Sequence, residues 1–130
     1  FTISRGAKTH VDVVVCTVSE DGVTGRGEGT AIYYEGESAE SCVAAILAYD
    51  GALERGTVQA GMGRGAARNA LDCALWDLEA KQAGVPVWQL AGLAVPGPLN
   101  TAFTISLGEP GRMEADARAA AARGFTLLKC

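Results

Sequence analysis

Residues that commonly build metal and redox sites are scarce in this sequence. It contains one histidine, His10, and four cysteines, none of which forms a Cys-x-x-Cys pair. A lone histidine without a cysteine or a second histidine nearby does not predict a zinc site. Three of the cysteines lie in apolar runs, where cysteine behaves as a small hydrophobic residue, so reduced core thiols are favoured over disulfides. A cytoplasmic location is the corresponding expectation.

Long apolar runs and an excess of positive charge are also missing. No stretch of about 18 apolar residues occurs, so no segment is expected to cross a membrane. Eleven basic residues against fifteen acidic ones give a net charge of −4, which disfavours binding to phosphate backbones and anionic lipid. The first residues, FTISRGAKTH, show no signal-peptide pattern and no methionine. Neither nucleic acid nor a membrane is therefore an expected partner.

The first part of the chain predicts a hairpin followed by helices. Residues 11–34 alternate in polarity around Asp21-Gly22, which is typical of a hairpin turn. The second strand of this hairpin contains Gly25, Gly27 and Gly29, which indicate a bulge or the close approach of another element. Residues 38–53 predict a helix that begins after Ser38, with apolar residues at helical spacing up to Leu53.

The strongest helix signal covers residues 67–84. It has one apolar stripe and ends at Gly84, a position suited to a left-handed helix terminus. The stripe consists of Leu71, Ala74, Leu75 and Leu78. After a linker, TAFTISL predicts a strand, residues 109–124 a helix, and FTLLKC a second strand. Strand, helix and strand with short links predict a parallel βα unit, which needs further strands on both sides. The sequence is therefore interpreted as part of a longer protein.

The stretch GMGRGA, residues 61–66, has the spacing of a dinucleotide-binding loop. Such a loop requires a buried strand directly before the glycines and an acidic residue about 20 positions later, after the next strand. The preceding ERGTVQA has no strand pattern, and the later VPVWQL has neither a strand pattern nor an acidic residue. Glycines at the entry to a tightly packed helix are favoured over nucleotide binding.

Several segments together resemble the enolase superfamily, in particular its muconate-lactonizing subgroup and, within it, the L-Ala-D/L-Glu dipeptide epimerases. The segments that carry the resemblance are GRGEGTAIYYEGES, GAARNALDCALWDLEAKQAGVPVWQLAGL, TAFTISL and the terminal LLKC. The resemblance implies an α+β capping domain followed by a modified (β/α)₈ barrel. Residues 1–95 would be the capping domain, and residues 96–130 the first βα unit and second strand of a barrel that is incomplete in this chain.

The activity that this resemblance implies is metal-assisted epimerisation of dipeptides by 1,1-proton transfer through an enediolate. Mg²⁺ or another divalent metal would neutralise the enediolate, on ligands expected outside these 130 residues, with none in this chain. Related superfamily members racemise N-acylamino acids, form o-succinylbenzoate or cycloisomerise muconate, and a non-catalytic fragment is a further alternative. Because both bases and all metal ligands would lie elsewhere, the 130 residues alone are expected to be inactive.

The resemblance assigns site roles to four residues. Lys129 would be the first lysine of a Lys-x-Lys pair, an auxiliary group beside a catalytic base that lies beyond Cys130. Thr104, at the end of the first barrel strand, would contact the substrate. Arg5 and Lys8 would hold an anionic substrate from a specificity loop.

The same resemblance places a second loop of the capping domain, with Tyr33, Tyr34 and Glu35, near the pocket without ranking these residues. The expected partner is a small dipeptide, and assembly with further copies of the chain stays open.

Overall fold

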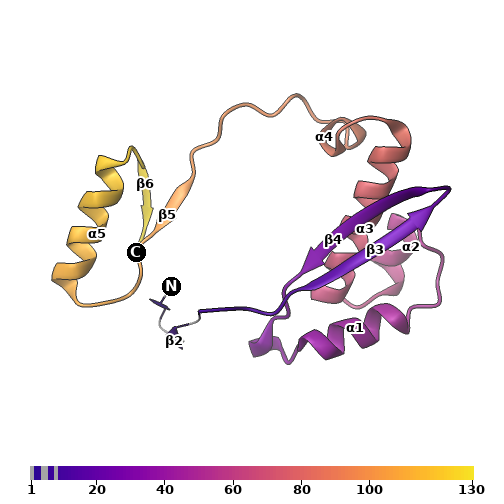
Figure 1. Ribbon diagram of the computed structural model, residues 1–130, viewed down its shortest axis with the longest axis horizontal. Helices are drawn as coiled ribbons and strands as arrows, with labels where there is room; N and C mark the ends of the chain where they lie inside the picture. Colours follow the sequence, from indigo (N-terminus) through magenta and orange to yellow (C-terminus); the bar gives the residue numbers. More distant parts are fainter. Residues whose placement is uncertain (1, 4–5, 8) are drawn as a thin grey trace. The chain divides into compact units, whose positions relative to one another are not determined.

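The computed structural model describes residues 2–3, 6–7 and 9–130, and Figure 1 shows the course of the chain. The contacts between residues divide the chain into two compact units. One unit is Val11–Pro96, and the other contains Gly97–Cys130 together with the first ten residues. Within the second unit, β1 (Thr2–Ile3) pairs antiparallel with β2 (Gly6–Ala7). Each unit is described separately below.

The predicted hairpin is confirmed. Strands β3 (Val14–Glu20) and β4 (Val23–Gly29) pair antiparallel in unbroken register, so the glycines do not mark a bulge. Asp21 and Gly22 connect the strands with φ values of 48° and 78°, the left-handed conformations that a two-residue hairpin turn requires. One face of β3 is buried through Val14, Cys16 and Val18.

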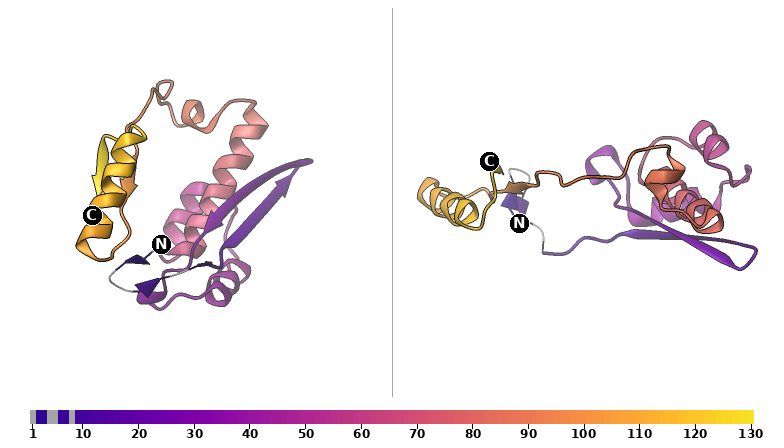
Figure 2. Two further views of the ribbon diagram at one scale, coloured as in Figure 1. Left: turned by 60° about the vertical axis from the view of Figure 1, so that its left-hand side comes forward. Right: turned by 90° about the horizontal axis from the view of Figure 1, so that it is seen from above.

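Helix α3 (Ala66–Ala83) lies along the buried face of this hairpin (Figure 2). The three glycines of β4 face three small residues of α3, spaced four apart: Ala66, Ala70 and Ala74. Two residues of strand and four of helix both advance by about 6 to 7 Å, so the two rows stay matched. A Cβ at Gly27 would lie closer than 3.0 Å to backbone atoms of Ala70 and Ala74. The glycines therefore permit a strand–helix approach that no side chain would allow.

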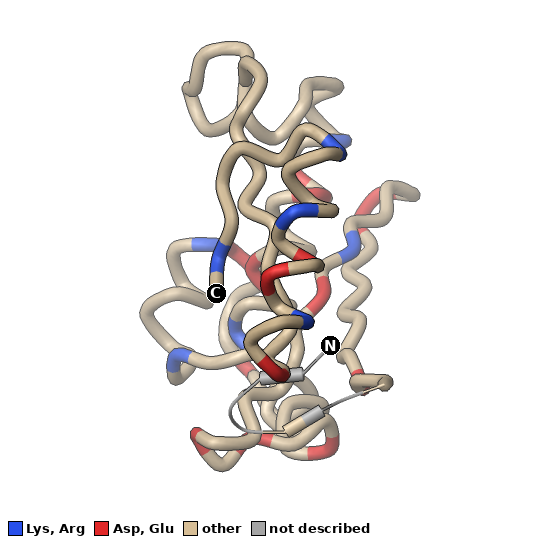
Figure 3. The backbone as a smooth tube through the Cα atoms, turned by 90° about the vertical axis from the view of Figure 1, so that its left-hand side faces the viewer, with Lys and Arg blue, Asp and Glu red and all other residues tan. Residues whose placement is uncertain are grey.

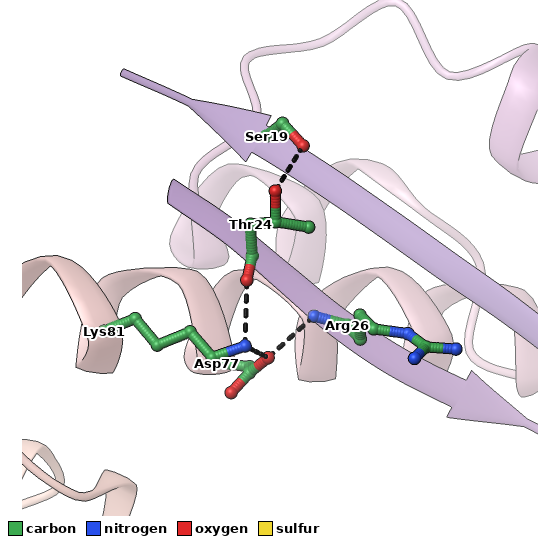
Figure 4. Close-up of polar contacts among 5 residues, drawn as sticks. All are labelled: Ser19, Thr24, Arg26, Asp77 and Lys81. Atoms are coloured by element: carbon green, nitrogen blue, oxygen red, sulfur yellow. Dashed lines mark hydrogen bonds and ion pairs between the residues drawn. The ribbon is translucent and has the colours of Figure 1, made fainter. Parts of the chain in front are cut away.

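Side chains of α3 also bind the outer edge of β4. Asp77 accepts a hydrogen bond from the Arg26 N–H at 2.8 Å, and Lys81 donates to the Thr24 carbonyl at 2.8 Å and to Asp77 at 2.7 Å (Figure 4). About two turns earlier in α3, the Asn69 side-chain amide donates to the carbonyl of Glu28 at 3.0 Å. These bonds satisfy backbone groups that β3 does not reach, so the helix protects a strand edge that is otherwise open to further pairing.

Asp77 makes the stability of the Val11–Pro96 unit depend on pH. Hydrogen bonds from Lys81 and from the Arg26 N–H hold the pKa of Asp77 below its ordinary value of 3.8. Because the folded-state pKa is depressed, this stabilisation is complete above the unfolded-state pKa and is lost as pH falls through the folded-state pKa. Between about pH 6 and pH 3, Asp77→Asn should therefore lose less free energy of unfolding than the wild type in urea titrations. Equal acid dependence of the two proteins would contradict this role.

The helices around α3 differ in part from the sequence-based prediction. Helix α1 (Ala39–Leu47) begins at Ser38 as predicted, with reciprocal hydrogen bonds between Ser38 and Ser41, but it ends six residues before Leu53. Leu53 lies beyond the helix, so the prediction that helical spacing continues to Leu53 is wrong, and Leu47 and Leu53 are 80% and 54% exposed. Helix α2 (Arg55–Gly61), which the sequence did not predict, buries Val58 completely. A short helix, α4 (Val87–Leu90), follows α3 after Gly84, whose φ of 66° confirms the predicted left-handed terminus.

The second unit contains the predicted strand–helix–strand order. Strands β5 (Ala102–Thr104) and β6 (Leu127–Lys129) pair in parallel, and α5 (Pro110–Ala122) connects them. This arrangement confirms the predicted βα unit. Two ion pairs join residues four apart on α5, Arg112 with Asp116 and Arg118 with Glu114. Figure 3 shows basic and acidic residues along this helix. Among the described residues, none of the helices is long and apolar enough to cross a membrane.

Candidate functional site

The parallel pairing of β5 and β6 brings two of the predicted site residues together. Thr104 and Lys129 are register partners at the last positions of their strands. Partners in neighbouring parallel strands point to the same face, about 5 Å apart at Cα, so both side chains project from one side of this two-stranded sheet. The Ile105 N–H donates to the Lys129 carbonyl at 2.9 Å and extends the pairing beyond both strands. The two strand ends therefore present a hydroxyl and a cation side by side.

The surroundings of these residues differ in accessibility. Thr104 is half-buried and Lys129 is exposed, whereas Ile105 is only 4% exposed. A cavity of about 190 Å³ lies between the end of β5 and α5. Its lining includes Thr104, Ser106, Asp116 and Arg123. Hydroxyl, carboxylate and guanidinium groups thus surround a small space directly beside Thr104.

Two aromatic rings and a guanidinium lie close together near the end of β5. The rings of Phe103 and Phe125 lie 4.8 Å apart, and the Arg123 guanidinium carbon lies 5.2 Å from each ring centre. A guanidinium within about 6 Å of a ring centre is attracted by the negative charge of the ring face. Because Phe103 directly precedes Thr104, these contacts hold the strand end in place. The sequence analysis did not identify Arg123, since no spacing pattern links it to the two phenylalanines.

The other two predicted site residues lie outside the described residues. The roles of Arg5 and Lys8 therefore stay predictions. The residues of the second predicted loop, in contrast, are described. They form a short 3-10 turn, η1 (Tyr33–Glu35), with Tyr33 and Tyr34 more than half exposed.

Glu37 connects this turn to α3. Its Oε2 accepts a hydrogen bond from the Ile32 N–H at 2.8 Å, and its Oε1 accepts one from the Ala66 N–H at 2.9 Å. Ala66 is the first residue of α3, so the carboxylate occupies the positive end of that helix. This residue was missed in the sequence analysis because its two partners are backbone groups, and one of them lies 29 residues away.

The geometry around GMGRGA excludes a dinucleotide-binding arrangement. Helix α2, not a strand, leads into the glycines, and the N-terminus of α3, where a pyrophosphate would bind, already holds the carboxylate of Glu37. The loop instead lines a cavity of about 570 Å³ with α1 and α2. Its polar lining includes Asp50, Thr57 and Arg64.

The acidic residues of α3 have structural contacts rather than a shared ligand geometry. Asp77 bonds β4, as described above, and Glu79 pairs with Arg55 at 2.8 Å, while Arg55 lies over the Trp76 ring. Asp72 differs from these two residues, because its Oδ1 is buried without a hydrogen-bond partner. Within the described residues, no three His, Cys, Asp or Glu side chains are grouped so that they could hold a metal ion.

The cysteines are all reduced in the described part of the chain. Cys16 and Cys42 are buried in the core of the Val11–Pro96 unit, as predicted, whereas Cys73 and Cys130 are exposed. Burial raises the pKa of the Cys16 thiol, which keeps it in the unreactive protonated form.

Comparison with known proteins gives a consistent set of relatives. The family described as "Mandelate racemase / muconate lactonizing enzyme, N-terminal domain" matches residues 1–92. The L-Ala-D/L-Glu epimerase of Escherichia coli (strain K12) is 38% identical over 133 residues, covering 99% of this chain and 41% of that protein.

Two solved structures extend the comparison. An enolase family member from Agrobacterium tumefaciens with homology to dipeptide epimerases was solved with sodium, L-Ala-L-Glu and an ordered loop. It is 47% identical, with a TM-score of 0.85 over 98% of this chain and 40% of that chain. The dipeptide epimerase from Cytophaga hutchinsonii, complexed with Mg and D-Ala-L-Val, is 28% identical, with a TM-score of 0.83 over 98% of this chain and 38% of that chain. The chain thus spans about two fifths of the length of these relatives.

Proposed function

The chain belongs to the mandelate racemase/muconate lactonizing enzyme family, and on this premise we propose that the full-length protein carrying it epimerises dipeptides of the L-Ala-D/L-Glu type. Its α+β unit is the family's N-terminal capping domain. We further propose that β5, α5 and β6 begin a (β/α)₈ barrel, with the domain boundary near residue 95. The observation that carries the proposal is similarity to dipeptide epimerases along 98–99% of the chain.

The proposed reaction is a 1,1-proton transfer at the α-carbon of the C-terminal residue of the dipeptide. The α-C–H bond breaks, its electron pair moves into the neighbouring carboxylate to give an enediolate, and a base takes the proton. Return of a proton to the opposite face of the α-carbon inverts its configuration. The barrier is high because the enediolate gathers two negative charges on one group, so nearby cations stabilise the transition state.

Within this chain, Lys129 and Thr104 are the residues proposed to act at that step. At the ends of parallel barrel strands, both would face the active site. The Lys129 cation would favour the build-up of negative charge on the carboxylate, and the Thr104 hydroxyl would hydrogen-bond the substrate. Arg5 and Lys8 would bind an anionic group of the substrate. The proton-transferring lysine and the metal ligands are expected outside these residues, and the relative solved with Mg supports an expectation of Mg²⁺ dependence.

A substrate panel tests this proposal. The full-length protein, assayed with Mg²⁺ in deuterated water, should convert L-Ala-L-Glu to L-Ala-D-Glu and incorporate deuterium at the glutamate α-carbon. N-acetyl-L-glutamate should exchange at least about tenfold more slowly, because it lacks the dipeptide's free amino group. The groups that bind this amino group in a site built for dipeptides would then be left unpaired. Exchange with the acylated amino acid and none with the dipeptide would overturn the substrate assignment, and exchange with neither would overturn the epimerase itself.

A further inference from the structure

A serine, Ser106, follows strand β5 two positions after Thr104. The Ile105 N–H bonds to the Lys129 carbonyl at 2.9 Å, so the backbone stays extended and paired beyond the end of β5. Side chains two positions apart in an extended chain point to the same face. The exposed fractions agree with this alternation, because Ile105 is 4% exposed whereas Thr104 and Ser106 are half-buried. Ser106 therefore shares a face with Thr104.

This face of the two-stranded sheet is the open one. On β6, Leu127 is 51% exposed and Lys129 is exposed, whereas Leu128 between them is half-buried. Thr104 is the register partner of Lys129, so the row of Thr104 and Ser106 lies on the side of these exposed residues. A ligand can approach the row from this side.

The polar groups of this face have no protein partners. Within the part of the chain that the structure describes, neither the hydroxyls of Thr104 and Ser106 nor the ammonium of Lys129 takes part in a hydrogen bond or ion pair. Thr104 and Ser106 also border the cavity of about 190 Å³ at the end of β5, so there is free volume beside them. All three groups can donate a hydrogen bond. The open face thus presents three unused donors, one of them positively charged.

The spacing of these donors suits a carboxylate. Residues two apart on a strand are separated by about 6 to 7 Å at Cα, and register partners by about 5 Å, so the long Lys129 side chain can reach toward Ser106. A carboxylate has two oxygens with about four acceptor positions, enough for all three donors at once. Bonds from a lysine cation and a hydroxyl to an ionised acceptor are also stronger than bonds between neutral groups.

We infer that the Ser106 hydroxyl donates a hydrogen bond to the substrate carboxylate that becomes the enediolate. This inference rests on the proposed function, which supplies the carboxylate and places it beside Lys129. When the α-C–H bond breaks, its electron pair moves into this carboxylate, whose oxygens gain negative charge while a base takes the proton. A donor already aimed at these oxygens stabilises the transition state more than the bound substrate. Ser106 therefore speeds proton removal more than it tightens binding.

The test compares the full-length protein with its Ser106→Ala, Ser106→Cys and Ser106→Thr variants, using L-Ala-L-Glu. In the alanine and cysteine variants, kcat should fall about tenfold while KM changes by less than about threefold. Cysteine is close to serine in size but is a weak donor, so it separates the loss of the hydroxyl from a loss of packing. Ser106→Thr keeps the hydroxyl and should stay within about threefold of the wild-type kcat.

The distribution of deuterium gives a second readout. In deuterated water, label should enter both the remaining L-Ala-L-Glu and the newly formed L-Ala-D-Glu. A hydrogen bond to the carboxylate acts on proton transfer at both faces of the α-carbon, so Ser106→Ala should keep the wild-type ratio of label in the two dipeptides. A changed ratio would mean that Ser106 acts on the base at one face, and it would overturn the carboxylate contact.

Thr126→Val is the matched control, because it removes a hydroxyl directly before β6, at the opposite end of the paired strands. It should leave kcat and KM at wild-type values. Wild-type kcat in Ser106→Ala and Ser106→Cys would overturn the inference, and so would a rise in KM at constant kcat or a threonine variant as slow as the alanine variant. A wild-type protein that exchanges no dipeptide would refute the proposed function and this contact together. An active wild type with unaffected Ser106 variants would refute the contact alone.

Discussion

Replacing Gly27 with alanine should destabilise the Val11–Pro96 unit by about 3 kcal/mol or more, or prevent it from folding. The added Cβ would meet the Ala70 carbonyl oxygen, the Ala74 backbone nitrogen and the Cys73 Cβ, all closer than 3.0 Å. Backbone atoms cannot rotate away as a flexible side chain can, so strand and helix must separate. That separation would also lengthen the bonds from Asp77 and Lys81 to β4. Urea unfolding followed by circular dichroism measures the loss.

Gly56→Ala is the matched control for this prediction. Gly56 lies inside α2, has nothing within 4 Å of an added Cβ and shows no positive φ. Alanine there should stabilise by up to about 1 kcal/mol, because glycine weakens helix interiors. Replacing glycine with alanine is thus expected to lower the free energy of unfolding at position 27 and to raise it at position 56. A Gly27→Ala protein as stable as the wild type would contradict the close packing of β4 on α3.

Replacing Lys129 with methionine should reduce kcat/KM for α-hydrogen exchange of L-Ala-L-Glu by about 10²-fold or more in the full-length protein. Methionine preserves the length of the side chain and removes its cation, so the enediolate would lose a stabilising charge. The unfolding midpoint of the variant, measured alongside, separates this loss from a loss of stability. Stopped-assay chiral chromatography and mass spectrometry of deuterium uptake give kcat and KM.

Lys81→Met provides the control for charge removal. Lys81 binds the Thr24 carbonyl and Asp77 in the capping domain, so its loss should lower stability and leave kcat/KM unchanged. If Lys129→Met retained wild-type kcat/KM, the auxiliary role of Lys129 would be wrong.

The parts of this fold that follow local rules could be predicted from sequence. Asp21-Gly22 favours a hairpin turn by conformation alone, and Gly84 favours a helix end for the same reason. The glycines of β4 indicated a close approach, but only the structure shows that its partner is the row of alanines on α3. Helix α2 was missed because its two glycines weaken every local helix signal, and burial of Val58 against the core compensates for them.

The candidate site shows a similar division. The parallel unit predicted from TAFTISL and FTLLKC is what makes Thr104 and Lys129 neighbours, so their pairing followed from topology. Glu37 and Arg123 could not be found in this way, because their contacts are with backbone groups and rings brought together only by folding. Neither residue type nor spacing distinguishes them from the exposed charges that surround them.

The central claim is that β5 and β6 bring Thr104 and Lys129 to one proton-transfer site, and a double-mutant cycle tests it most directly. The measurement is kcat/KM for α-hydrogen exchange of L-Ala-L-Glu by the full-length wild type, Thr104→Val, Lys129→Met and the double variant. Neighbouring residues that act on one substrate group should couple by about 1 kcal/mol or more. The double variant should therefore lose less than the two single losses combined. Additive losses, or wild-type rates in either single variant, would contradict the account.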